Sequence, residues 1–178
     1  MKRAVLLSLA LGALTGSAVA QDHTMMNHTM SMAAMPDDAR QPVTFPPMMR
    51  QRILANMRDH LEAMSGILAA LGAGDYAKAG RIADARLGVN SPAAAGCKAG
   101  GDNVGKPQMS SPMDMEQMMA QYMPTGMRQA GFSMHQAASD FAAEAAKAAG
   151  SGDGKPALSA LARVTQGCTA CHSAYRVQ

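Results

Sequence analysis

Between residues 44 and 178, apolar side chains recur at intervals of three and four positions, which is the spacing of helices that pack along one face. The first such stretch follows Thr44, which can cap it, and runs to about Leu71. Gly72 and Gly74 are expected to end it. Its predicted inward positions are Arg50, Leu54, Met57, Leu61, Met64, Leu68 and Leu71. The pattern therefore predicts one long, continuous first helix.

Three further helices are predicted. The second covers residues 76–87, with Asp75 as its cap and Gly88 at its end. The third covers residues 125–149 and follows a short methionine-rich helix from about residue 113, because Pro124 and Gly126 interrupt the pattern. The fourth opens at Pro156. The predicted inward positions of these three helices are Tyr76, Ala79, Ile82, Ala83 and Leu87, then Met127, Ala130, Met134, Ala138, Phe141 and Ala145, then Leu158, Leu161, Val164, Cys168, Cys171 and Tyr175.

Two segments lack a helical period. Residues 89–112 are rich in Gly, Ser, Pro and Asn, and we expect a long loop. It carries Cys97, which we expect as an exposed thiol, with an intermolecular disulfide as the alternative. Residues 21–43 are polar and crowded with methionine and histidine, and we expect a disordered tail. Thioether and imidazole donors together suit Cu(I). Copper binding is therefore one interpretation of this tail, and a weakly constrained linker is the other.

Composition narrows the fold class. The chain has 178 residues, 18 of them methionine, with no tryptophan and only 3% aromatic residues. Runs of Val, Ile, Thr and aromatic residues, which are typical of strands, are missing, so an all-α fold is predicted. The formal net charge is +3, and it falls to +1 if Lys2 and Arg3 are removed with the N-terminal segment described next. A charge so close to zero does not indicate a nucleic-acid partner.

Residues 1–20 are organised as a secretory signal peptide. Lys2 and Arg3 precede an apolar run over residues 4–13, and Ala18-Val19-Ala20 is a small-residue cleavage site. The apolar run is too short to remain as a membrane anchor. We therefore expect a protein exported to the periplasm, with no membrane anchor and a single domain over residues 44–178.

The clearest chemical signal is Cys168-Thr169-Ala170-Cys171-His172, which has the pattern C-x-x-C-H. Two thiols on one helical turn can each add to a vinyl group of haem, and the adjacent imidazole is then offered to the iron. A thioredoxin-like redox pair is expected after a strand, and a structural zinc site needs a second pair of ligands. Neither context is present in the sequence. The motif therefore predicts one covalent haem c on Cys168 and Cys171, with His172 as the proximal ligand.

Four helices, an export signal and a single C-x-x-C-H in the last helix resemble the class II cytochromes c, which comprise cytochrome c′ and its low-spin, methionine-ligated relatives. The resemblance is carried by residues 167–176 and by Arg50-Gln51-Arg52-Ile53-Leu54, which is similar to the stretch where that family places its distal residue. It implies an antiparallel four-helix bundle with covalently attached haem c. It also implies that Leu54 lies beside the iron, and it suggests a homodimer through the first two helices.

Three functions remain open. In the first, Met57 lies one turn beyond Leu54 and is the distal ligand, and the protein carries single electrons between redox partner proteins. In the second, the iron is five-coordinate beside Leu54 and binds a small gas such as NO or CO. In the third, the methionines handle copper or silver and the haem is their redox partner.

Enzymatic catalysis is not indicated, because the sequence has no recognisable Ser/His/Asp set, carboxylate pair or phosphate-binding loop. His60 and His135 each lie one position beside a predicted inward stripe. We expect both at the surface, with bis-histidine ligation of the iron as the less favoured alternative.

Overall fold

The computed structural model describes residues 38–98 and 112–178, and these are mostly helical. The elements, in chain order, are β1 (Gln41–Val43), α1 (Pro47–Gly72), α2 (Tyr76–Leu87), the 3₁₀ helix η1 (Pro92–Gly96), α3 (Pro112–Ala120), α4 (Thr125–Ser151), α5 (Lys155–Ala174) and β2 (Tyr175–Val177). The expected all-α class is confirmed. In the described part of the chain, no helix is both long and apolar enough to cross a membrane.

Local signals account for most of the helix ends. The Asp75 carboxylate accepts a hydrogen bond from the backbone N–H of Lys78 at 2.8 Å, as expected for the cap of α2. Gly152 ends α4 in the left-handed conformation, with φ of 77°, which glycine adopts without strain. The prediction for Thr44 is wrong: α1 begins after Pro46, and no side chain of the described residues caps it. Proline fixes φ and so replaces the expected threonine cap as the start signal.

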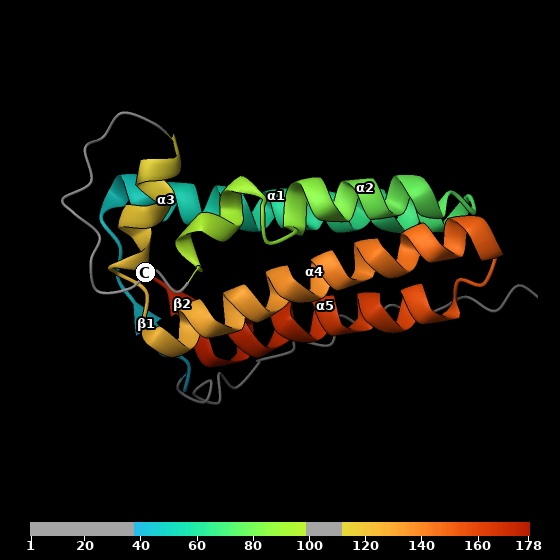
Figure 1. Cartoon of the computed structure of the whole chain (residues 1–178). Coiled ribbons are helices and arrows are strands. Elements are labelled where there is room, and N and C mark those ends of the chain that lie inside the picture. The colour runs from blue at the N-terminus through green and yellow to red at the C-terminus, as the bar shows by residue number, and fades with distance from the viewer. Residues whose placement is uncertain (1–37, 99–111) are drawn as a thin grey trace, which may run out of the picture. The chain divides into compact units, whose positions relative to one another are not determined.

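The long helices pack in chain order. In Figure 1, α1 and α2 lie together, as do α4 and α5, and α2 also packs against α4. Alanine dominates the core between them, which brings the helix axes close together. The larger buried side chains include Ile67, Leu87, Phe141 and Val164. Close packing of this kind is the main source of helix stability in a globular protein.

The predicted inward face of α1 is partly wrong. Leu61 and Leu68 are 70% and 56% exposed, whereas Ala63, Ile67 and Ala70 are buried. The buried stripe therefore lies one position before the predicted one, and two of its members, Ala63 and Ala70, are small enough to let a neighbouring helix pack closely. At the start of α5 the same effect exposes Leu158.

Two segments expected to be irregular contain short elements. Residues 92–96 of the predicted loop form η1. Gln41–Val43, at the end of the predicted tail, forms a strand that pairs in parallel with Tyr175–Val177. The methionine- and histidine-rich part of the tail and the predicted signal peptide lie in residues 1–37, outside the described part of the chain.

We expect Gly167→Ala to destabilise the protein by about 1–3 kcal/mol, because overpacking forces helices apart. A Cβ at Gly167 would lie only 2.8 Å from the Cβ of Met134, where α5 approaches α4. The matched control is Gly150→Ala near the end of α4, where an added Cβ has nothing within 4 Å. Chemical denaturation should show a lower free energy of unfolding for Gly167→Ala only. Equal effects of the two changes would show that α4 and α5 are not in close contact at this point.

Candidate functional site

A cavity that is partly open to solvent lies where α1, η1, α3, α4 and α5 meet. The apolar part of its wall is rich in thioether groups: Met57, Met119, Met123, Met127 and Met134. Cys171 and His172 of the C-x-x-C-H motif line the same cavity. The only sequence-predicted cofactor motif therefore opens into this space.

The last two turns of α5 position the motif. Cys168 lies one turn before His172, half-buried against the alanine-rich core and not on the cavity wall, whereas Cys171 is half-buried on that wall. Burial raises the pKa of both thiols, so both are protonated at neutral pH. Neither forms a disulfide in this structure. The structure thus brings Cys171 and His172 directly to the cavity and Cys168 to its edge.

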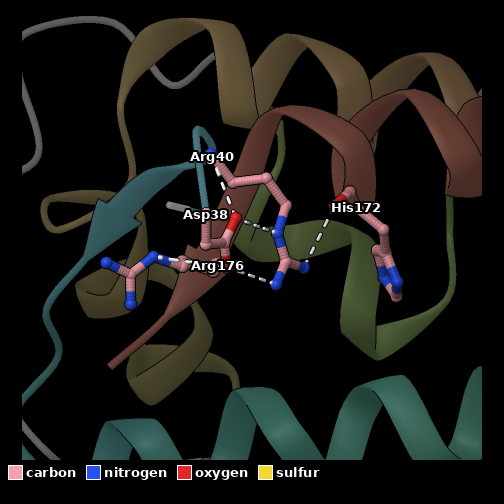
Figure 2. Close-up of polar contacts among 4 residues, drawn as sticks. All are labelled: Asp38, Arg40, His172 and Arg176. Atoms are coloured by element: carbon pink, nitrogen blue, oxygen red, sulfur yellow. Dashed lines mark hydrogen bonds and ion pairs between the residues drawn. The ribbon is translucent and has the colours of Figure 1, made fainter. Parts of the chain in front are cut away.

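The end of α5 is tied to the residues just before β1. Arg40 forms an ion pair with Asp38 at 2.7 Å and donates a longer hydrogen bond, 3.4 Å, to the backbone oxygen of His172. Figure 2 shows the imidazole of His172 pointing away from this cluster, while Arg176 approaches Asp38 from β2. The hydrogen bonds from Arg40 lower the pKa of the Asp38 carboxyl to about 2. These contacts help to hold the backbone of His172 at the junction of α5 and β2.

On α1, the structure distinguishes between the two predicted distal residues. Met57 is half-buried on the cavity wall. Leu54 is also half-buried, but it packs in a neighbouring apolar cluster with residues such as Ile53 and lies off the wall. Arg50, the first predicted inward position, is exposed. Met57, and not Leu54, therefore shares the cavity with His172.

His60 and His135 also line the cavity, so their expected surface position is wrong. His135 is 1% exposed, and its Nδ1 lies 2.7 Å from the carbonyl oxygen of Leu87, so Nδ1 must carry the proton and donate. The His60 ring meets the His135 ring edge to face, with the ring centres 5.5 Å apart. Its buried Nε2 has no hydrogen-bond partner in the part of the chain that the structure describes. Helical position alone could not reveal this pair, because both residues flank their predicted stripes.

We expect stability to fall as the pH drops from about 6.5 to about 4. Burial, then the charges of His135 and His172, lower the pKa of His60 to about 4, so the folded protein resists protonation that the unfolded chain accepts near pH 6.5. The full difference corresponds to about 3 kcal/mol at most. Burial also lowers the pKa of His135, which adds to the loss in the same direction.

The test is the free energy of unfolding against pH for the wild type and for His60→Phe. Phenylalanine keeps an aromatic ring against His135 but cannot take up a proton. The variant should lose less stability between pH 6.5 and 5, where few carboxylates titrate. If the two curves run parallel, His60 is not held neutral by the fold.

A buried polar cluster on the same wall was not predicted. Glu116 of α3 is 1% exposed, and its Oε1 accepts a hydrogen bond from Nε of Arg52 at 2.6 Å. The side-chain amide of Asn56 donates to both carboxylate oxygens, at 3.2 and 3.0 Å. Arg52 and Asn56 lie one turn apart on α1, so the cluster joins α1 to α3. The sequence around Glu116 is methionine-rich and without a period, so nothing there marks this residue as buried.

Cys97 follows η1 and lies on the wall too, half-buried instead of exposed as expected. It packs against Gly131 of α4, where an added Cβ would collide with its sulfur. Burial raises the pKa of this thiol to about 11, and the nearby Cys171 and Glu116 act in the same direction. The thiol is therefore unreactive at neutral pH.

Taken together, the wall offers the exposed imidazole of His172, the half-buried thiol of Cys171 and the thioether of Met57 as possible ligands or attachment points in a mainly apolar space. Among the described residues, no three His, Cys, Asp or Glu side chains are placed to hold a metal ion by themselves. Comparison of the chain with protein-family models, with curated proteins and with solved structures finds no match in any of the three.

Proposed function

We propose that the protein is an exported mono-haem c-type cytochrome that carries one electron at a time. The observation that carries this proposal is that Cys171 and His172 of the C-x-x-C-H motif share one apolar cavity with Met57. When bound, haem c would supply an iron that cycles between the ferric and ferrous states. The protein would supply attachment, axial ligands and a low-dielectric surrounding.

The residues present fit such a group. Each motif thiol would add across a vinyl group, so that the S–H bond breaks, a C–S bond forms and the hydrogen passes to the second vinyl carbon. His172 would ligate the iron from α5, and Met57 would ligate it from α1. A pair of axial ligands that does not change with oxidation state keeps reorganisation small and favours electron transfer.

The fold would act as an antiparallel four-helix bundle around this group. Support comes from the order of packing, in which α1, α2, α4 and α5 follow one another round the core. The helices α1 and α5 approach each other less closely than α4 and α5 do, and the cavity lies at their ends near the motif.

The predicted signal peptide in residues 1–20 supports export to the periplasm, where haem c is attached and disulfides form. The partners of the cytochrome would be proteins that donate and accept single electrons. The cavity is partly open and His172 is exposed, so a haem held by the motif would lie near the protein surface. Such a position suits electron exchange with partner proteins.

The test is to express the full chain with its leader in a bacterium that attaches haem c and to recover the protein from the periplasm. We expect a denatured mass that includes one haem, and a visible spectrum of six-coordinate, low-spin haem in both oxidation states. CO should change the reduced spectrum little. A mass without haem would overturn the proposal, and a high-spin spectrum that responds fully to CO would favour gas binding.

A further inference from the structure

Glu116 brings a full negative charge to the cavity at a point where the rest of the wall is nearly uncharged. It is 1% exposed, and among the described residues that line the cavity it is the one acidic residue. The neighbouring groups are thioethers, the protonated thiol of Cys97 and the two histidines with lowered pKa values. In this low-dielectric surrounding, a fixed charge acts more strongly than it would in water.

The ion pair with Arg52 is oriented with respect to the cavity. Glu116 and Asn56 are on the wall, whereas Arg52 is not, and the Arg52 side chain is 35% exposed to solvent. Water therefore screens the guanidinium more than the carboxylate. The negative end of the pair faces inward.

We propose that Glu116 sets the reduction potential of the group held in this cavity, by favouring its oxidised form. This inference rests on the function proposed above. One-electron reduction adds one negative charge to the site, with the electron coming from a redox partner protein and no proton taken up. A carboxylate fixed on the wall opposes that added charge, and the effect of Arg52, on the far side and in contact with solvent, is smaller and opposite in sign.

A purely structural role is the competing explanation, because the cluster also joins α3 to α1. Two substitutions separate the roles. Glu116→Gln keeps the length and shape of the side chain and removes its charge, whereas Glu116→Asp keeps the charge and shortens the side chain. If the role is structural, Glu116→Asp should change the reduction potential at least as much as Glu116→Gln does. If the role is electrostatic, only Glu116→Gln should change it.

The measurement is the midpoint potential of the purified haem protein, taken by spectroelectrochemistry at neutral pH. We expect Glu116→Gln to favour the reduced form by about tenfold, which is about 59 mV upward for a one-electron couple. Glu116→Asp should stay within about threefold of the wild type. Arg52→Gln should shift the potential downward by a smaller amount and remains informative if Glu116→Gln folds poorly.

The matched control is Glu62→Gln, which removes a carboxylate of the same type from the outside of α1. Glu62 is 69% exposed and pairs with Arg86 at 3.2 Å. Its loss should leave the potential unchanged. Unfolding by denaturant, measured on the same samples, reports how much each variant weakens the α1–α3 contact independently of the potential.

The proposal is overturned if Glu116→Gln leaves the potential within about twofold of the wild type, or if Glu116→Asp shifts it as far as Glu116→Gln does. An upward shift in Arg52→Gln would overturn it as well. Failure of the proposed function looks different: the wild type itself would then carry no covalent haem, and the unfolding data alone would remain to show the cluster's structural role.

Discussion

The double variant Cys168→Ala, Cys171→Ala is expected to retain no haem after acid–acetone extraction, whereas the wild-type protein retains all of it. Thioether bonds survive this treatment, but iron ligation by His172 does not, because acid protonates the imidazole. The measurement is the absorbance of the extracted protein and its denatured mass. The expected change is complete loss, which makes this the largest effect among the variants considered.

Cys97→Ala is the matched control for that experiment. Cys97 is the third thiol of the chain and lies on the same cavity wall as Cys171, but it lies outside the motif. Its removal should leave haem attachment intact. Loss of haem from Cys97→Ala, or extraction of haem from the wild type, would contradict attachment through the motif.

The double variant should also be less stable than the wild type. Without a covalent group, the cavity has no occupant to bind the folded state selectively. Apolar side chains around an unfilled cavity lose their packing contacts. Thermal unfolding monitored by helical circular dichroism would show this as a lower Tm, and an unchanged Tm would indicate that the cavity closes or fills with water.

Local sequence signals predicted much of the fold. The Asp75 cap of α2, the start of α4 at Thr125 and the start of α5 beside Pro156 each depend on the backbone chemistry of one or two residues. Such signals act within a single turn, so no knowledge of the tertiary structure is needed. The all-α class followed in the same way from composition.

The face of α1 could not be predicted in this manner. Both Leu61 and Ala63 belong to apolar stripes, and hydrophobicity favours the leucine. The structure buries Ala63 and, one turn further on the same stripe, the larger Ile67. Which stripe is buried thus depends on how the helices pack against one another, which no local pattern encodes.

The site shows the same division. The C-x-x-C-H motif is local, because a single helix, α5, carries all of it, with Cys171 and His172 on the cavity wall. Glu116 and Asn56 are separated by 60 residues in sequence, and Arg40 and His172 by 132, yet they are hydrogen-bonded in the structure. These pairings depend on how α1, α3 and the chain ends meet, so only the folded arrangement reveals them.

The ligand opposite His172 decides between electron transfer and gas binding, and Met57→Leu tests it. Leucine is close to methionine in volume, so the substitution should cost less than about 1.5 kcal/mol of stability. If Met57 is the ligand, the variant should change from low-spin to high-spin. CO should bind the ferrous form of the variant at least about tenfold more tightly than it binds the wild type, because CO no longer has to displace a thioether from the iron. A tenfold change corresponds to an iron–thioether bond that contributes at least ~1.4 kcal/mol.

Met64→Leu is the control for loss of a thioether from α1, because Met64 is half-buried against the alanine-rich core and lies off the cavity wall. Its spectrum should match that of the wild type. A wild type that is already high-spin, with no change in Met57→Leu, would instead identify an open gas-binding site. A low-spin spectrum that persists in Met57→Leu would point to His60, one turn along α1, whose buried Nε2 has no hydrogen-bond partner among the described residues. The three outcomes therefore correspond to ligation of the iron by Met57, an open distal position and ligation by His60.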